Sequence, residues 1–318
     1  MPASHAPHLS PAGLSVGADR PSRPALWLRA TRPLYLPTSV VPGLAGALVA
    51  IGAEDATWWL LPVTLLALLL VHAGTDVCNE VEDAANGVDP VDKMDNSGVF
   101  NRGLLSIAEG RRLYAALFAA AFALGVFICL IQGPVLLAIG VAGILGGWLY
   151  TGGPRPYKYD GLGDPLIVLL MGPLLTQGAY TAITGDGFHA DAFWLGLAPG
   201  LLIASVLAAN NASDIEGDRA AGVRTMAVRL GFARARALFL VMLTAAVATP
   251  VVLWATGVFS AWILLPLVLL PLAVARARQA LSARASGDER LLTLAPGTAQ
   301  LHLLFCLLLC AGVVLDRA

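Results

Sequence analysis

Carboxylate and amide side chains gather in one stretch of an otherwise apolar chain. Asn210, Asn211, Asp214 and Asp218 fall within the segment NNASDIEGD, directly after a run rich in Leu, Ala and Ile. On a continuing helix, Asp214 and Asp218 project from one face because they are four residues apart. Their charges repel unless a cation lies between them, and a divalent cation with oxygen ligands suits that position. A charged loop in solvent is the competing interpretation of this stretch alone.

A second acidic stretch lies far upstream, also at the end of an apolar run. Asp76, Asn79, Glu80 and Asp83 recur there at helical three-to-four spacing. Two acidic helix ends in one chain predict one shared site. Because no thiolate or imidazole accompanies them, Mg²⁺ is favoured over zinc or copper. Such an ion binds one or two carboxylates and completes its shell with phosphate oxygens of a substrate.

The composition is that of an integral membrane protein. Of 318 residues, 57% are hydrophobic and only 13% are charged. The net charge of −1 gives no electrostatic support to a role in nucleic-acid binding. The four cysteines lack paired metal-ligand spacing and the five histidines are scattered, so neither set predicts a metal centre.

Nine apolar runs are long enough to cross a bilayer, which takes about 20 residues. Residues 1–25 are rich in Pro, Ser, Ala and His and lack an apolar core, which indicates a disordered cytoplasmic tail rather than a signal peptide. We therefore expect an all-α polytopic membrane protein with nine transmembrane helices, in which residues 26–318 form a single domain. The runs are 34–53, 58–78, 113–131, 134–151, 164–184, 192–210, 236–257, 260–275 and 293–315.

The basic residues indicate the orientation of the chain in the membrane, because Lys and Arg accumulate on the cytoplasmic side. With nine spans and a cytoplasmic N-terminus, all of the 20 basic residues except Arg317 fall in or beside cytoplasmic segments. This topology places both acidic stretches on the cytoplasmic face, after the second and the sixth spans. The spacing hints at two similar halves, although no sequence repeat is strong enough to prove it.

Basic side chains share these cytoplasmic segments with the acidic stretches. A metal ion and cations together neutralise a diphosphate leaving group, which carries several negative charges. Some of these cations are equally interpreted as anchors at the cytoplasmic face, and a tyrosine beside a Gly-Gly-Pro turn is equally a common interfacial residue. The candidate diphosphate-binding residues are Lys93, Arg102, Tyr150, Arg155, Lys158 and Arg224.

Four motifs occur together in this chain. They are Asn79-x-x-x-Asp83, Tyr150-Thr-Gly-Gly-Pro154, Asp160-Gly-Leu-Gly-Asp164 and the segment from Asn210 to Arg224 that contains both later aspartates. The combination resembles the UbiA superfamily of intramembrane prenyltransferases, and within it the 1,4-dihydroxy-2-naphthoate polyprenyltransferases of menaquinone synthesis. The resemblance covers roughly residues 27–315. It implies a nine-helix bundle around a central cavity that opens to the cytoplasm and laterally to lipid.

The resemblance also implies a reaction and the residues that carry it. Asn79, Asp83, Asp214 and Asp218 would be catalytic and would hold Mg²⁺ against a polyprenyl diphosphate, with Glu80 as a further residue of the metal site. The diphosphate leaves, and an electron-rich aromatic ring attacks the resulting allylic carbocation. In the naphthoate branch the ring carboxylate is lost as carbon dioxide and a demethylmenaquinone results. The candidate acceptor-binding residues are Asn210 and Asn211.

The partners and location follow from the same resemblance. They are a polyprenyl diphosphate, a small aromatic acceptor and the lipid bilayer, and no obligate protein partner is evident. We expect the chain in the bacterial inner membrane with its active site facing the cytoplasm.

The sequence departs from the family pattern at three positions. Glu80 stands where Asp is usual and is one methylene longer. Gly87 occupies the third acidic position, and Asp89 follows two residues later, as in many naphthoate enzymes. Val223 replaces a lysine that is frequent in the naphthoate branch, which bears on the identity of the acceptor.

Three other functions compete with prenyl transfer to a naphthoate. The same chemistry on another aromatic acceptor, such as a hydroxybenzoate, homogentisate, a tetrapyrrole or a natural-product ring, is not separated from it by these motifs. A secondary transporter would place its ion site near the bilayer midplane, whereas these acidic residues lie at helix ends. A phosphatidyl-type alcohol phosphotransferase requires an Asp-Gly-x-x-Ala-Arg sequence, which this chain lacks.

Overall fold

The computed structural model describes residues 21–88 and 97–318, and within these residues the regular structure is entirely helical. The expected all-α fold is therefore confirmed. Lys93, Asp89 and most of the predicted tail at 1–25 lie outside the described residues. The helices are α1 (Arg23–Ala30), α2 (Pro37–Leu48), η1 (Trp58–Leu60), α3 (Leu61–Ala85), α4 (Ile107–Gln132), α5 (Val135–Thr151), α6 (Gly163–Leu170), α7 (Pro173–Thr184), α8 (Ala190–Leu195), α9 (Leu197–Ser213), α10 (Ile215–Ala220), α11 (Met226–Leu230), α12 (Phe232–Ala255), η2 (Ala261–Leu269), α13 (Leu270–Ser282), α14 (Glu289–Leu292) and α15 (Leu294–Arg317).

Seven helical segments of the described chain are long and apolar enough to cross a membrane. Each coincides with one of the predicted apolar runs, and the shorter α5 and α2 occupy the two remaining runs. The number of nine crossings and the side of the N-terminus stay predictions. The spanning segments are Trp58–Ala85, Ile107–Gln132, Gly163–Thr184, Ala190–Ser213, Phe232–Ala255, Ala261–Ser282 and Glu289–Arg317.

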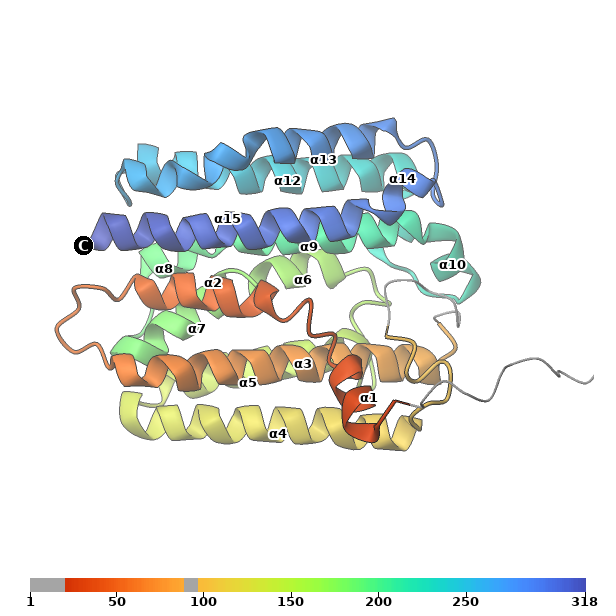
Figure 1. Ribbon diagram of the computed structural model, residues 1–318, viewed down its shortest axis with the longest axis horizontal. Coiled ribbons are helices and arrows are strands. Elements are labelled where there is room, and N and C mark those ends of the chain that lie inside the picture. The colour runs from red at the N-terminus through yellow and green to blue at the C-terminus, as the bar shows by residue number, and fades with distance from the viewer. Residues whose placement is uncertain (1–20, 89–96) are drawn as a thin grey trace, which may run out of the picture.

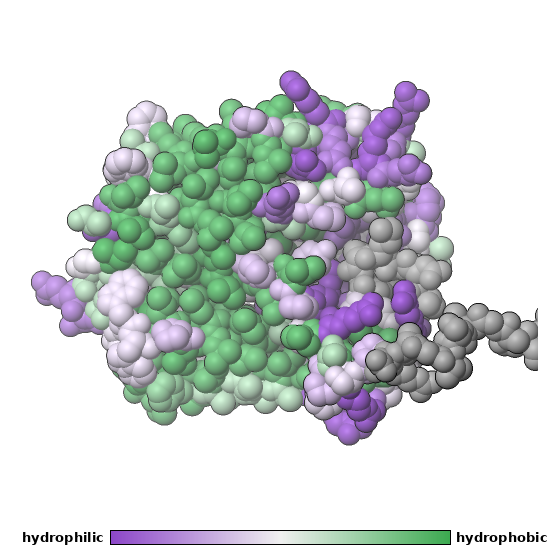
Figure 2. Space-filling model, in the orientation of Figure 1, coloured by the Kyte–Doolittle hydropathy of each residue, from purple (hydrophilic) through white to green (hydrophobic). Residues whose placement is uncertain are grey.

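The long helices lie side by side, with α1, α10 and α14 at one end of the bundle and the C-terminus at the other (Figure 1). The face seen in Figure 2 carries a broad hydrophobic band across these helices, while hydrophilic side chains gather mainly at the end with α1, α10 and α14. Large apolar side chains in solvent contact, such as Trp59 and Leu130, are numerous. A surface of this kind is suited to lipid.

Helix ends follow local sequence signals. Ser106 opens α4 with a capping box, because its hydroxyl accepts from the Glu109 N–H and the Glu109 carboxylate accepts from the Ser106 N–H. The α3 helix continues to Ala85, past the predicted end of its apolar run at residue 78. Gly87, with φ of 65°, then turns the chain in a conformation that favours glycine. The acidic residues of the upstream stretch therefore lie on a helix, as their spacing predicts.

The α2 helix is short and starts inside the bundle. Its 12 residues rise about 18 Å at 1.5 Å each, less than the roughly 30 Å of a hydrocarbon core. The segment before it contains Arg32, whose φ of 50° makes it the only non-glycine residue with positive φ in the described chain. Backbone strain of this kind persists where the surrounding structure imposes it. The result is that Arg32, Thr38 and Ser39 all face an internal cavity.

Glycines allow two close helix crossings, one between α2 and α7 and one between α9 and α6. A Cβ atom at Gly46 of α2 would lie 2.6 Å from the Thr176 Cα of α7. Gly200 of α9 similarly faces the backbone of Val168 in α6. Small residues at such contacts are typical of helix packing in membranes, where close backbone approach replaces hydrophobic driving force.

We expect Gly46→Ala to destabilise the fold by about 1–3 kcal/mol, because the added methyl group meets backbone and not a side chain that can move. Thermal unfolding in detergent would measure this change. Gly140→Ala in α5 is the matched control, because a Cβ there meets nothing within 4 Å. Equal unfolding temperatures for the two variants would contradict this account of the crossing.

Candidate active site

One internal cavity of about 660 Å³ runs between the helices and is lined by both acidic stretches. Much of its wall is apolar and comes from α3, α5, α6, α7 and α9. Its polar wall contains Asn79 and Asp83 from α3, Asp218 from α10, and Lys158 from the loop after α5. The structure therefore brings residues of both acidic stretches to one cavity, and their joint function stays a prediction. The cavity is hydrophobic along its length and charged where the acidic stretches meet.

Asp83 is the most completely buried carboxylate of the site. Its exposed fraction is 0%, and it accepts a hydrogen bond from Lys158 Nζ at 2.6 Å and one from the Tyr159 hydroxyl at 2.6 Å. Burial, followed by the charge of Asp83 and the hydrogen bond to it, raises the pKa of Tyr159 above its usual range. The phenol therefore stays protonated at neutral pH and remains a donor to the carboxylate.

The loop after α5 is folded so that Lys158 reaches α3. The backbone N–H groups of Tyr157 and Lys158 donate to the carbonyls of Leu149 and Tyr150, each at 3.0 Å. The rings of Tyr150 and Tyr157 pack edge to face with centroids 5.5 Å apart. Gly153, with φ of 73°, allows the sharp turn. The motif that begins at Tyr150 thus positions a lysine against an acidic residue of another helix.

Glu80 is held by the protein itself. Its Oε1 atom accepts from the Ser97 N–H at 2.6 Å and lies 3.8 Å from Arg32 Nε, and its Oε2 atom accepts from the Ser97 hydroxyl. Both oxygens are thus already engaged, and only 5% of the residue is exposed. The expected place of Glu80 in the metal site stays a prediction. The observed contacts instead connect α3 to the segment that begins at residue 97.

The downstream acidic stretch is not one continuous helix, which corrects the expectation from its spacing. The α9 helix ends at Ser213, Asp214 departs from helical geometry with φ of −114°, and α10 begins at Ile215. The Asp214 side chain folds over Gly217, where a Cβ would collide with its Oδ1 atom. Asp218 accepts from the Thr225 hydroxyl at 2.9 Å. Each aspartate is therefore oriented by a different local contact.

A loop from the far end of the chain supports this helix break. Ser286 Oγ and the Gly287 N–H donate to the Ser213 carbonyl, each at 3.1 Å, and the Ile215 N–H donates to Ser286 Oγ at 3.2 Å. These bonds pair the backbone groups that the interruption at Asp214 would leave unsatisfied.

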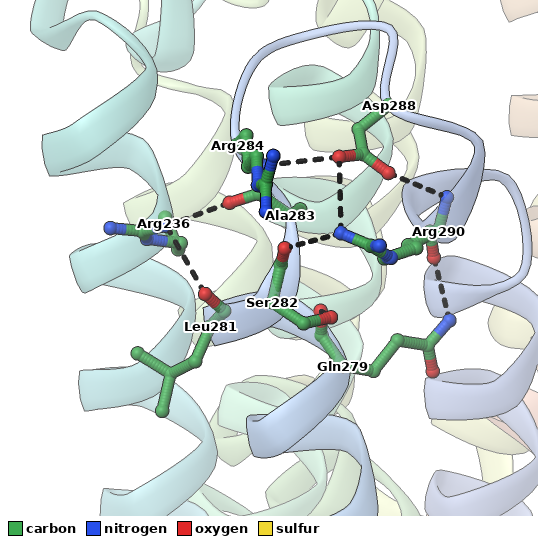
Figure 3. Close-up of polar contacts among 8 residues, drawn as sticks. All are labelled: Arg236, Gln279, Leu281, Ser282, Ala283, Arg284, Asp288 and Arg290. Atoms are coloured by element: carbon green, nitrogen blue, oxygen red, sulfur yellow. Dashed lines mark hydrogen bonds and ion pairs between the residues drawn. The ribbon is translucent and has the colours of Figure 1, made fainter.

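The loop is itself held in shape by arginines and one carboxylate (Figure 3). Arg236 donates to the Ala283 carbonyl at 2.8 Å and Arg290 to the Ser282 carbonyl at 2.7 Å. Asp288 accepts from the backbone N–H groups of Arg284 and Arg290, which hold the pKa of its carboxyl below the usual range. The next residues, Leu291 and Leu292, line the cavity. The loop therefore joins α12, α13 and α14 to the second acidic stretch.

The predicted diphosphate-binding residues are divided by the structure. Tyr150 and Lys158 line the cavity. Arg102, Arg155 and Arg224 are exposed and do not line it, and Arg155 pairs with Asp160 at 3.2 Å. Lys93 lies outside the described residues. The roles of these side chains stay predictions, but the geometry favours the first two.

Asn210 and Asn211 both line the cavity, so the structure brings the predicted acceptor-binding residues into the common site. One cation of the cavity wall was absent from the predicted site. Arg32 lies with its guanidinium 4.4 Å from the ring centroid of Tyr35 and beside Glu80. Arg32 directly precedes a proline, and this was the sequence feature that could have identified it. A cation ahead of the first span is also commonly a residue that anchors the chain at the membrane surface.

The donor chemistry of the site fits Mg²⁺ in part. Asn79, Asp83, Asp214 and Asp218 offer amide and carboxylate oxygens from facing elements, which are the ligands that Mg²⁺ prefers. Among the described residues, however, no three His, Cys, Asp or Glu side chains form a ready metal-binding group. An ion at this site would need further oxygen ligands, and the phosphate oxygens of a substrate are of that kind.

A helical membrane bundle with an apolar cavity that ends in two acidic motifs is the architecture of an enzyme that acts on an amphipathic substrate. Residues 39–304 match the UbiA prenyltransferase family, and the chain belongs to that family. It is a prenyltransferase.

Characterised relatives extend over most of the chain. The 1,4-dihydroxy-2-naphthoate octaprenyltransferase of Mycobacterium tuberculosis is 34% identical over 82% of this chain and 87% of its own. The Bacillus subtilis protein of the same name is 28% identical over 77% of this chain and 78% of its own.

Solved structures share the fold at low sequence identity. A UbiA homologue from Archaeoglobus fulgidus bound to DMAPP and Mg²⁺ has a TM-score of 0.62 and 19% identity, covering 91% of this chain and 98% of that chain. The apo structure of a UbiA homologue from Aeropyrum pernix K1 has a TM-score of 0.65 and 20% identity, covering 90% and 98%. These structures confirm the predicted helical fold, and the family match at residues 39–304 confirms the predicted family.

We expect Asp83→Ala to cost about 3 kcal/mol of stability, because it leaves the Lys158 ammonium, 11% exposed, without its carboxylate. Adding Lys158→Met should restore most of that loss, since it removes the charge that the Asp83 carboxylate neutralised. Unfolding of the two single variants and the double variant in detergent would measure the coupling between these residues. Additive losses in the double variant would show that the two side chains do not stabilise each other.

Proposed function

We propose that this enzyme transfers a polyprenyl group from a polyprenyl diphosphate to 1,4-dihydroxy-2-naphthoate in a Mg²⁺-dependent reaction that releases carbon dioxide. The observation that carries the proposal is the polarity of this cavity, whose wall is largely apolar and which is acidic, with Lys158, at one end. A polyprenyl diphosphate has the same polarity. Relatives named for the naphthoate reaction, at 28–34% identity over most of the chain, support the choice of acceptor.

The residues of the cavity end have distinct tasks in this reaction. Asn79, Asp83, Asp214 and Asp218 would hold Mg²⁺, which when bound neutralises the leaving diphosphate. Lys158 adds a cation at the same end, and Tyr150 packs beneath it, with the ammonium 5.7 Å from the ring centroid. Apolar side chains from α5 and α7 surround the prenyl chain and exclude water from the allylic carbocation.

The site would face the cytoplasm of a bacterial inner membrane. The support is the distribution of Lys and Arg, which places all but Arg317 on or beside that face in a nine-span topology. The described cavity end shares its side of the bundle with α1, α10 and α14 (Figure 1). We further propose that residues 26–318 act as one domain, preceded by a tail at 1–25.

The reaction is tested with the full chain in nanodiscs, a polyprenyl diphosphate, Mg²⁺ and 1,4-dihydroxy-2-naphthoate, with 4-hydroxybenzoate in parallel. We expect a prenylated naphthol that has lost carbon dioxide, detected by its mass, and no product when EDTA removes the metal. Prenylation of 4-hydroxybenzoate alone would assign a different acceptor to the same chemistry. Product formation at full rate in EDTA would overturn the role of the metal.

We expect Lys158→Met to raise the KM for the prenyl diphosphate at least tenfold, because a charged hydrogen bond contributes about 1.5–3 kcal/mol. Arg155→Met and Arg224→Met should change it less than about threefold, since both side chains are exposed and outside the cavity lining. Steady-state kinetics at saturating acceptor would measure the three values. Equal effects at all three positions would instead support a broad basic surface as the diphosphate site.

A further inference from the structure

A second group of polar side chains lies deeper in the same cavity than the acidic motifs. Ser39 of α2 and His72 of α3 are joined by a contact of 2.9 Å between Ser39 Oγ and His72 Nδ1. On the other side of the imidazole, His72 Nε2 lies 3.7 Å from Asp76 Oδ2. All three residues line the cavity, and the side chains of His72 and Asp76 are only 11% and 14% exposed. Ser39 and His72 were absent from the predicted site, and Asp76, the first residue of the upstream acidic stretch, had no predicted role.

The hydrogen-bond inventory of this group lacks one donor. Ser39 Oγ donates its hydrogen to the Leu36 carbonyl at 3.1 Å, so it accepts from His72 Nδ1–H, and we assign that tautomer. The Nε2 atom of a neutral His72 then presents a lone pair toward Asp76. The Asp76 Oδ2 atom is buried and has no hydrogen-bond partner among the described residues. Two acceptors therefore face each other, and a hydroxyl group bound beside them would donate its one hydrogen to either of them.

The neighbouring charges do not supply that donor. Glu80, one turn along α3, is engaged by Ser97 and Arg32, and Asp83 by Lys158 and Tyr159. His302 of α15 is close enough to interact electrostatically with His72 but does not line the cavity. In the described chain His72 is the single ion-pair partner recorded for Asp76. The group is thus a buried hydrogen-bond acceptor that opens onto the substrate cavity.

The position of the group along α3 suits the aromatic partner of the reaction. Asp76 is seven residues before Asp83, which is about 10 Å along a helix that rises 1.5 Å per residue. A prenyl diphosphate whose phosphates lie at Asp83 would extend its first carbons toward this level. An aromatic ring held at Asp76 and His72 would therefore lie beside the carbon that is attacked.

We propose that Ser39, His72 and Asp76 form the subsite that binds a ring hydroxyl of the aromatic acceptor and removes its proton. This inference rests on the proposed function. The hydroxyl O–H bond breaks, its proton forms a bond to His72 Nε2, and the electron pair stays on the oxygen as a phenolate. A ring carbon of the phenolate then bonds to the first carbon of the prenyl group, whose bond to diphosphate oxygen breaks with its electrons on the diphosphate.

The remaining members of the group stabilise the product of the proton transfer. Asp76 pairs with the imidazolium that His72 becomes, and Ser39 accepts from its Nδ1–H. General base catalysis by a positioned histidine contributes about 10²–10⁴-fold to a rate. The contact between Ser39 and His72 also connects α2 to α3, so a purely structural role is the alternative that an experiment has to separate.

The test uses the full chain in nanodiscs with Mg²⁺, a polyprenyl diphosphate and 1,4-dihydroxy-2-naphthoate. We expect His72→Gln and Asp76→Asn to lower kcat/KM for the naphthoate at least a hundredfold, while the Kd of the prenyl diphosphate changes less than threefold. His189→Gln and Asp191→Asn, the same changes outside the cavity, are the matched controls and should leave both values unchanged. A structural role alone would not separate the two substrates in this way.

A binding measurement on the unaltered chain provides a readout without any variant. The naphthoate should bind at least tenfold more tightly than the monomethyl ether that is blocked at the bound hydroxyl, because this ether cannot donate there, and the two substitutions should reduce this ratio to less than twofold. Equal affinity of the unaltered chain for the naphthoate and each ether would overturn the subsite. So would a His72→Gln variant that retains more than a third of kcat/KM. If the unaltered chain prenylates no hydroxylated aromatic compound, the proposed function itself fails, and the subsite fails with it.

Discussion

The structure depends on supplying partners to Asp83, Glu80 and Asp218, three carboxylates that lie in an apolar bundle. Moving a charge out of water costs several kcal/mol unless a partner of opposite charge and hydrogen bonds replace the lost hydration. Asp83 meets this requirement through Lys158 and Tyr159, Glu80 through Ser97 and Arg32, and Asp218 through Thr225. The contacts of Asp83 and Glu80 also join segments that are distant in the sequence, so these charges organise the end of the bundle that holds them.

The same requirement applies to the backbone. A helix that breaks at Asp214 would expose carbonyl and N–H groups to a largely dry interior, at a cost comparable to lost hydrogen bonds. Ser286 and Gly287 pair those groups, and the arginines around Ser282 and Ala283 hold the loop that carries them. The C-terminal helices therefore contribute to the site through the shape of α9 and α10 as well as through the cavity wall. This explains why a site with few functional side chains requires the whole bundle.

Sequence patterns predicted the membrane-spanning helices well because each is a long apolar run. They also predicted that Asp83 and Asp218 lie near each other, because both follow such runs. They failed where the determining contact is distant or conformational. The break at Asp214 depends on Gly217 and on a loop some seventy residues later. Whether Lys158 or Arg155 faces the cavity depends on how the loop after Tyr150 folds. Both cations lie in that loop, so the local sequence does not distinguish between them.

His72 illustrates the same limit for a single residue. A lone histidine in an apolar run is usually interpreted as a packed core residue. Within its own run, His72 has only Asp76 as a possible polar partner. Its second partner, Ser39, is 33 positions away on a helix that begins inside the bundle. The short α2 and the left-handed backbone at Arg32 create that proximity, and neither is visible as a periodic pattern. The role of a polar residue in a membrane span therefore depends on the side chains of the helix that packs against it.

Glycine serves two opposite purposes in this bundle. At Gly46 and Gly200 the missing side chain is replaced by the backbone of a neighbouring helix, which brings α2 to α7 and α9 to α6. At Gly140 and Gly143 in the cavity wall, a Cβ would meet nothing within 4 Å, so the missing side chain remains as open volume. Close packing in the first pair fixes the walls of the cavity, and the absence of side chains in the second keeps its interior wide. Glycine thus contributes both to the rigid walls of the cavity and to the large apolar space between them. A cavity for a prenyl chain needs both features.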